Sequence, residues 1–323
     1  MNDLGTGSGG DAASYEIEPK NNFFEATRAI VEHEIRPGNT VTFLAEVDLT
    51  EVERLRALSA PGRKPSFTAI VIKAVALALR DFPYANRRVC RRAWLPFCTP
   101  RLQRFFRCDV AVAVERDIPG AESTAFIDIV RDADQQPLFE ITETLRALSI
   151  CDVNSNRQWR QFSTLITRLP TWLSAWLIRL PCFAPGQWVK YRGGAALVSS
   201  PAKYGVDVVA ATWSHPLGVS FGMVKPRPVV RDGAIIPCTT FLLTLNFDRR
   251  VMAGAQGARF FRRMVDALER AETEMRPYLD SLTDSPRSRP PTPMTDLVAA
   301  LEPVAPSLDG CRTPEPSRAE KSD

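Results

Sequence analysis

The chain has 323 residues, of which 45% are hydrophobic and 24% charged, and it carries only two histidines, His33 and His215. This composition is typical of a folded globular protein and excludes collagen-like, coiled-coil and wholly disordered chains. A net charge of +4 is too small by itself to indicate nucleic acid or an anionic membrane as the main partner. Two histidines and seven cysteines without a Cys-x-x-Cys pair also give no pattern for a zinc site, so no metal is expected.

The two ends of the chain differ in composition from its middle. Residues 1–20 are rich in Gly, Asp and Ser, and residues 276–323 are rich in Pro and Ser. Neither segment has enough apolar side chains to offset the entropy lost on folding. We therefore predict disordered ends and one folded domain over residues 21–275.

Nothing in the sequence marks export or a membrane span. The N-terminal residues lack the basic and then apolar pattern of a signal peptide, and irregularly spaced cysteines of odd number fit reduced thiols, so we expect a cytoplasmic protein. The longest apolar stretch, Leu169 to Val189, is interrupted by three prolines and Arg179. It therefore does not supply the roughly 20 apolar residues of a membrane span.

Apolar periodicity predicts a mixed sheet flanked by helices. Thr40 to Asp48 alternates like a strand, with Val41, Phe43, Ala45 and Val47 on one face. The other predicted strands are 109–114, 125–130, 195–199, 206–210, 217–224 and 239–247. The predicted helices are 50–58, with Thr50 as its cap, 66–79, 136–148 and 254–271.

Four segments in this order carry a resemblance: Thr42 to Thr50 (TFLAEVDLT), Asp109 to Asp134, Ala196 to Val206 (ALVSSPAKYGV) and Leu243 to Gly254 (LTLNFDRRVMAG). Together they resemble the catalytic domain of the dihydrolipoamide acyltransferases of 2-oxoacid dehydrogenase complexes and, more distantly, chloramphenicol acetyltransferase. The resemblance covers roughly residues 23 to 272. It implies an α/β sandwich of a mixed sheet flanked by helices and acyl transfer from a coenzyme A thioester.

The last segment is similar to the family's Asp-His-Arg-x-x-Asp-Gly signature, whose histidine is the general base. Asp248, Arg250 and Gly254 match it, but Arg249 replaces the histidine and Ala253 replaces the second aspartate. A guanidinium does not accept a proton near neutral pH. On this resemblance the chain is a degenerate member, a pseudoenzyme on its own.

The resemblance also assigns the remaining site residues. Ser199, followed by Ser200, falls where the family's serine or threonine stabilises the oxyanion. Arg28 resembles the arginine that pairs with the signature aspartate, here Ala253. Arg249 is then either a binding residue for an anion such as the coenzyme A phosphates or an inert arginine in a decayed site. His215 is either a displaced base or, as we favour, a structural residue.

Two further segments have both a functional and a structural interpretation. Arg87 to Arg107 contains seven arginines and no acid, which fits binding of nucleic acid or a nucleotide, although we favour a hairpin with a solvated basic face. Trp159 to Trp188 is rich in tryptophan and arginine, which fits an interfacial membrane helix, although we favour an inserted helical pair that covers the sheet or shapes a tunnel.

The resemblance implies trimers with active sites between subunits. No lipoyl-type motif precedes residue 20, so we expect a stand-alone catalytic domain. Three hypotheses follow. The first is a silent or impaired coenzyme-A-dependent acyltransferase homologue. The second is an active enzyme that uses a pre-ionised thiol acceptor, or a base from an active paralogue in a mixed trimer. The third is a structural or scaffold component whose tail recruits a partner.

Overall fold

The computed structural model describes residues 39–60, 62–90, 101–116, 124–150, 160–161, 164 and 168–279. The chain divides into two units, 1–281 and 282–323, and every described residue belongs to the first. His33, Arg28 and all but four residues of the predicted disordered ends lie outside the described residues. The predicted start of the tail at residue 276 was wrong, because Arg276–Tyr278 form a 3-10 helix and Leu279 is buried in the core.

Nine strands and seven α-helices are found in the described part of the chain. The strands are β1 (Thr40–Asp48), β2 (Arg87–Cys90), β3 (Arg101–Arg104), β4 (Val110–Arg116), β5 (Thr124–Val130), β6 (Ala196–Ser199), β7 (Leu217–Phe221), β8 (Lys225–Arg231) and β9 (Ala234–Asp248). The helices are α2 (Thr50–Ala57), α3 (Phe67–Asp81), α4 (Leu138–Ile150), α6 (Thr171–Phe183), α7 (Pro185–Tyr191), α8 (Gly254–Glu269) and α9 (Ala271–Met275).

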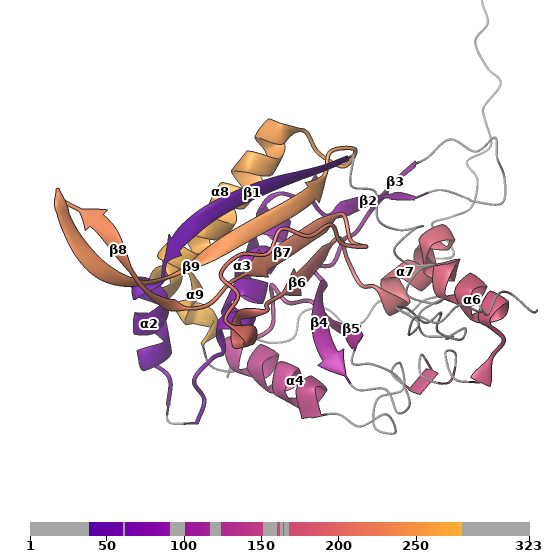
Figure 1. Ribbon diagram of the computed structural model, residues 1–323, viewed down its shortest axis with the longest axis horizontal. Coiled ribbons are helices and arrows are strands. Elements are labelled where there is room, and N and C mark those ends of the chain that lie inside the picture. Colours follow the sequence, from indigo (N-terminus) through magenta and orange to yellow (C-terminus); the bar gives the residue numbers. More distant parts are fainter. Residues whose placement is uncertain are drawn as a thin grey trace, which may run out of the picture. The chain divides into compact units, whose positions relative to one another are not determined.

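The described part of this unit contains a seven-stranded mixed sheet. Six strands follow the order β1-β9-β7-β6-β4-β5, and β8 pairs with residues 234–240 at the start of β9. β6 is parallel to both its neighbours, β4 and β7, whereas the remaining pairs are antiparallel. Helices α3 and α8 pack against one face, as Figure 1 shows. The predicted mixed sheet flanked by helices is confirmed.

The core lies between this helical layer and one face of the sheet. The predicted face of β1 is confirmed, because Val47 is fully buried and Val41, Phe43 and Ala45 pack against the same apolar cluster. From β9 the cluster receives Phe241, Leu243, Leu245 and Phe247. The alternate residues of these strands therefore point to the second face of the sheet.

Helix α3 begins as predicted, with the Ser66 hydroxyl accepting a hydrogen bond from the Ala69 N–H at 3.1 Å. It also buries one charged group, Lys73. The Lys73 ammonium donates to the carbonyl oxygens of Ala133, Asp134 and Gln136 at 3.0, 2.9 and 2.6 Å. The turn between β5 and α4 is thereby tied to the helical layer.

Two local predictions were wrong. Thr50 does not cap α2 with its own side chain; instead its N–H and hydroxyl both donate to Asp48 Oδ1, at 2.9 and 2.6 Å. Residues 206–210 form no strand, because both edges of β7 are already occupied by β6 and β9. This segment instead crosses the second face of the sheet, where the Thr244 hydroxyl donates to the Val209 carbonyl at 2.7 Å.

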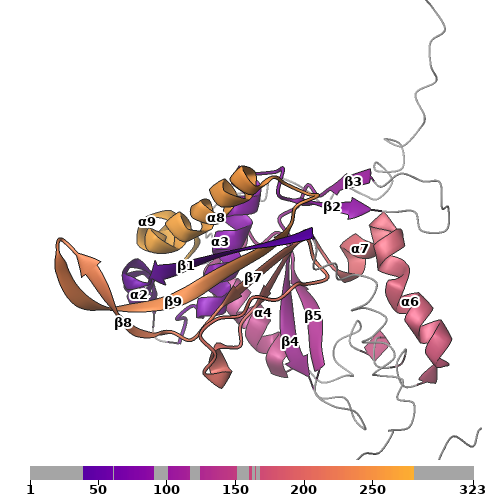
Figure 2. The same ribbon diagram turned by 45° about the horizontal axis from the view of Figure 1, so that its top comes forward.

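The basic segment 87–107 forms the expected hairpin, β2 paired with β3. Arg88 fixes it to α6 and α7, because its guanidinium donates to the carbonyl oxygens of Pro181 and Cys182 and stacks 4.1 Å from the centre of the Trp188 ring. Figures 1 and 2 both show this hairpin beside α7. Trp94 and Phe97 lie outside the described residues.

Candidate active site

The turn between β9 and α8 presents the signature residues. The Asp248 carboxylate accepts the Arg250 backbone N–H at 2.9 Å and forms an ion pair with the Arg250 guanidinium at 2.6 Å, which raises the pKa of Arg250. The Arg249 N–H donates to the Asn39 carbonyl at 2.8 Å. Arg249 therefore takes part in the turn through its backbone, while its side chain is exposed.

The next signature positions begin helix α8. Ala253 is the N-cap residue and Gly254 the first helical residue. The Ala253 N–H donates to Gln256 Oε1 at 3.0 Å, but the methyl group of Ala253 has no oxygen with which to cap the helix. Arg87 steadies the turn before it by donating from Nε and Nη2 to the Val251 carbonyl at 3.0 and 2.6 Å. The backbone of this turn is thus held by Asp248, Gln256 and Arg87, without contacts from the side chains of Arg249 and Ala253.

The two serines at the end of β6 have different environments. The Ser200 hydroxyl donates to the Phe221 carbonyl at 2.9 Å and accepts the Ala202 N–H at 3.3 Å, so it is a structural residue of this bend. Ser199 is half-buried and lies on the second face of the sheet, since Ala196 and Val198 belong to the core. Its strand partner is Ser220.

The register separates Ser199 from Arg249 within one chain. Ser199 pairs with Ser220 of β7, and Ser220 pairs with Thr244 of β9, so these three residues lie at one level of the sheet. Arg249 follows Thr244 by five positions, roughly 17 Å at the rise of an antiparallel strand. One chain therefore does not bring the predicted oxyanion donor and the predicted base position together.

A row of polar side chains occupies the second face between these two levels. Asn246 is buried, pairs with Gly218, and accepts a hydrogen bond from the Thr42 hydroxyl at 2.5 Å. Trp213 covers Gly218 so closely that a Cβ there would lie 1.9 Å from its ring. Sequence periodicity did not single out this row, although its residues are the alternate positions of β7 and β9.

His215 is a structural residue. Its Nε2 lies 2.8 Å from the Arg192 carbonyl oxygen, and because a carbonyl only accepts, Nε2 carries the proton. Burial, with a smaller contribution from the charges of Arg192 and Arg88, lowers the pKa of His215 to about 3. The ring also packs on Trp188, with centroids 5.3 Å apart. An imidazole of such low basicity is a poor proton acceptor at neutral pH.

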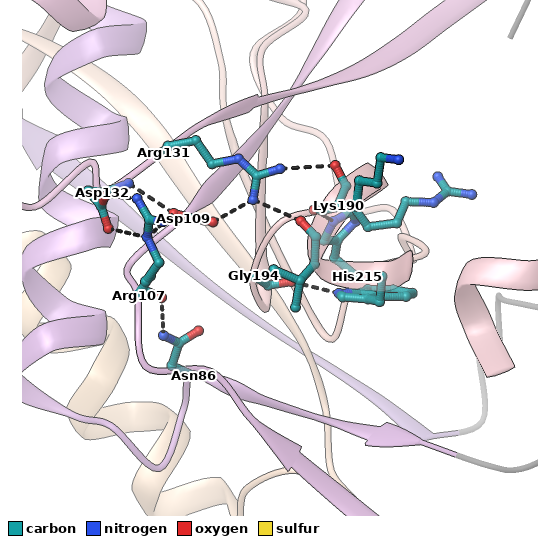
Figure 3. A network of polar contacts seen from close by, with 11 residues as sticks. Asn86, Arg107, Asp109, Arg131, Asp132, Lys190, Gly194 and His215 are labelled. Atoms are coloured by element: carbon teal, nitrogen blue, oxygen red, sulfur yellow. Dashed lines mark hydrogen bonds and ion pairs between the residues drawn. The ribbon is translucent and has the colours of Figure 1, made fainter. Parts of the chain in front are cut away.

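Figure 3 shows the network near His215, which ties the residues after β5 to the end of α7. Buried Asp109 accepts the Asp132 N–H at 2.9 Å and an Arg131 N–H at 2.6 Å. Arg131 also donates to the carbonyl oxygens of Val189 and Lys190, and Arg107 pairs with Asp132. The segment 131–134, part of the resemblance, therefore positions backbone here and leaves no free acid or base at Asp109.

The described part of the chain contains no cluster of metal-binding side chains and no membrane-spanning helix. Its His, Cys, Asp and Glu side chains form no group of three or more that could hold a metal ion. None of its helices is long and apolar enough to cross a bilayer. Burial raises the pKa of the Cys108 thiol to about 12, so it is no nucleophile at neutral pH.

The chain matches the family model of the 2-oxoacid dehydrogenases acyltransferase (catalytic domain) over residues 29–157 and 188–276. It belongs to this acyltransferase family. The matched ranges contain β1 to β9 and all four segments that carry the resemblance, but the model skips residues 158–187, which include α6.

Curated relatives of this acyltransferase-family chain are components of dehydrogenase complexes. The dihydrolipoyllysine-residue acetyltransferase component of the Rhizobium meliloti pyruvate dehydrogenase complex is 27% identical over 77% of this chain and 48% of its own length. A succinyltransferase component from Arabidopsis thaliana is 22% identical over 71% of this chain and 42% of its own. The chain therefore spans about half the length of these relatives.

Solved structures share the fold. The dihydrolipoamide acetyltransferase of Azotobacter vinelandii has a TM-score of 0.59 and 18% identity, over 81% of this chain and 94% of its own. The cubic core of a pyruvate dehydrogenase complex also has a TM-score of 0.59, with 19% identity over 84% of this chain and all of its own. A serine, a histidine and an asparagine four positions after the histidine were studied in the Azotobacter mechanism.

Proposed function

We propose that this chain, on its own, is a silent or severely impaired homologue of the coenzyme-A-dependent acyltransferases. The observation that carries the proposal is Arg249, exposed on a turn whose frame of Asp248 and Arg250 is intact. Acyl transfer from a thioester to a thiol or hydroxyl needs a group that takes the acceptor's proton. A guanidinium, with a pKa above about 12, does not take it.

The rest of the described chain supports this proposal, because the candidates for a replacement base are engaged elsewhere. His215 is buried, donates to the Arg192 carbonyl, and has a pKa lowered to about 3. Asp248 is paired with Arg250. Lys73 lies within the helical layer, on the face of the sheet opposite to Ser199.

A second function, as one subunit of a mixed assembly, is favoured by the placement of Ser199. Ser199 and Arg249 lie at different levels of the sheet. Within one chain, the predicted oxyanion donor is therefore separated from the predicted position of the base. If this chain forms trimers with a histidine-bearing relative, its Ser199 would face that relative's base. The acyl donor would then be a coenzyme A thioester and the acceptor a thiol of the dihydrolipoamide kind.

The test is acetyl transfer from acetyl-coenzyme A to dihydrolipoamide, measured for the wild type and three variants. We expect a rate near background for the wild type and for Arg249→Ala. The double variant Arg249→His, Ala253→Asp should raise the rate by about 100-fold or more, the usual contribution of a positioned base. Arg259→His, which places a histidine at an exposed position of α8, is the control and should change nothing.

Two further measurements separate the alternatives. Calorimetric titration with coenzyme A tests whether the nucleotide binds, and the mass of the oligomer tests whether trimers form. Wild-type turnover at ordinary enzyme rates that survives Arg249→Ala would refute the silent-enzyme proposal. If the trimer binds no coenzyme A, even with an added histidine-bearing relative, both enzymatic hypotheses fail and the scaffold hypothesis is supported.

A further inference from the structure

Helix α6 lies in the segment that separates the two ranges matched by the acyltransferase family model, 29–157 and 188–276. The strands that carry the candidate site all lie within the matched ranges. Figures 1 and 2 show α6 next to α7, and at the opposite end of this unit from the β8 hairpin. The helix is therefore an addition whose surface the acyltransferase site does not explain.

The two sides of α6 differ in exposure. Ser174 and Ile178, four positions apart, are buried at 1% and 7% exposure. Trp172 and Trp176, also four positions apart, are 73% and 56% exposed. Residues four apart share a helix face, so α6 packs with one face and presents two tryptophans on another.

The sequence segment around these tryptophans carries charge of one sign. From residue 153 to residue 206 the sequence contains no Asp or Glu, whereas it contains seven Lys and Arg, at positions 157, 160, 168, 179, 190, 192 and 203. Arg160, Arg168 and Lys190 are exposed. Arg168 precedes Trp172 by four positions, so at least this cation is close to the tryptophans along the chain.

Exposed tryptophans and exposed cations in one segment without acids match the chemistry of an anionic bilayer surface. Tryptophan favours the headgroup level of a membrane, and Lys and Arg favour anionic lipid headgroups. A 13-residue helix is about 20 Å long, too short to span the roughly 30 Å hydrocarbon core, so it would lie in the interface plane. We propose that α6 is a docking surface for an anionic lipid bilayer, with Trp172 and Trp176 as its anchors.

A second copy of the chain is the weaker occupant. A contact between two such faces would bring like charges together, because each copy carries the same acid-free segment. Binding to an anionic bilayer uses both the tryptophans and the charge. This surface is independent of the function proposed for Arg249 and Ser199, so its failure leaves that function untouched.

The experiment is co-sedimentation of the full chain with vesicles of phosphatidylcholine alone and of phosphatidylcholine mixed with phosphatidylglycerol. We expect binding to the mixed vesicles, weaker binding as salt is raised, and a blue shift of tryptophan fluorescence. Replacing both tryptophans (Trp172→Ala, Trp176→Ala) should weaken partitioning by about tenfold or more and abolish the shift. Arg168→Glu should weaken it by at least about fivefold.

Matched controls use exposed residues far from α6. Val230 and Ile235, 69% and 75% exposed on the β8–β9 hairpin, test exposed apolar area as such when both are changed to alanine. Arg259→Glu tests net charge in the same way. Neither control should change partitioning by more than about twofold, against the fivefold to tenfold expected at α6.

Four outcomes would overturn the proposal. Equal binding to neutral and anionic vesicles would show that charge does not drive binding. If the control variants lost as much vesicle binding as the α6 variants, the binding surface would not be α6. If the tryptophan variant instead lowers the mass of the oligomer while vesicle binding is absent throughout, the face is an interface between copies. Single-stranded nucleic acid binding lost in the same variant, without vesicle binding, would also refute it.

Discussion

The two ends of the candidate active site are held by different contacts. At the end of β6, Ser199 lies on the second face, and the bend beside it is held by Ser200. At the end of β9, the turn is held by Asp248 and Arg250, while Arg249 and Ala253 occupy the positions that we predict for the family's histidine and aspartate. The residues that shape each end are therefore different from the residues proposed for its chemistry, so substitutions test the two separately.

The largest expected effect tests the Ser199 end. In a mixed assembly with a histidine-bearing relative, Ser199→Ala should lower acetyl transfer at the shared sites by about 100- to 1000-fold, because an oxyanion donor is lost. Ser200→Ala is the matched control and should act on stability, since its hydroxyl binds the Phe221 carbonyl. Steady-state rates beside thermal unfolding of each variant separate the two. An unchanged rate in the Ser199 variant would show that this end, too, has lost its role.

A second prediction concerns the charge buried beneath the sheet, in Lys73. Lys73→Met should lower the free energy of unfolding by about 2–4 kcal/mol, because three buried carbonyl groups lose their donor. Urea unfolding measures this loss. Lys64→Met, at an exposed lysine, is the control. A loss below about 0.5 kcal/mol would mean that the turn after β5 is held by other contacts.

The same lysine predicts a pH dependence. Burial lowers the pKa of Lys73 to about 7, against a smaller opposing effect of Asp134, whereas an unfolded lysine titrates near 10.4. Between about pH 7 and pH 10 the unfolded state therefore binds more protons than the folded state, so this group makes stability rise with pH. The stability of the Met variant should lack this rise. An identical pH profile in both proteins would contradict the prediction.

The smallest effects contrast two neighbours in the turn. Asp248→Ala should cost about 1–2 kcal/mol, because the Arg250 N–H and guanidinium lose their acceptor. Arg249→Ala should stay within about 0.5 kcal/mol, because only the backbone of Arg249 is engaged. Thermal unfolding of both variants compares them directly. A larger loss in the Arg249 variant would mean that its side chain supports the turn.

The sequence predicted most of the fold where apolar periodicity was strong. β1 was predicted over its full length, and α3, predicted over residues 66–79, spans Phe67–Asp81. β8 was missed because Pro226 and Pro228 interrupt its pattern, although an edge strand tolerates them. Residues 206–210 have strand composition, but no free strand edge is left beside β7 for them to pair with.

The arrangement of the candidate site was not predictable from the sequence, and the roles of its residues stay predictions. The signature motif points to Arg249 and Ala253 because they differ in residue type from the family's motif within a short segment. The distance between Ser199 and Arg249 depends on the register of three strands far apart in the sequence, which no local pattern encodes. The network around Asp109 was missed for the same reason, since its partners come from residues 131–132 and 189–190.

The exposed side chain of Arg249 has one consequence for the history of this protein. Because the turn is held by Asn39, Asp248 and Arg250, we expect substitutions at position 249 to have little effect on folding. At such a position a single codon change exchanges histidine, which accepts a proton, for arginine, which stays positively charged. A histidine at position 249 could then be lost and regained in evolution without loss of the fold. In protein engineering, the same exposed position could carry other reactive side chains.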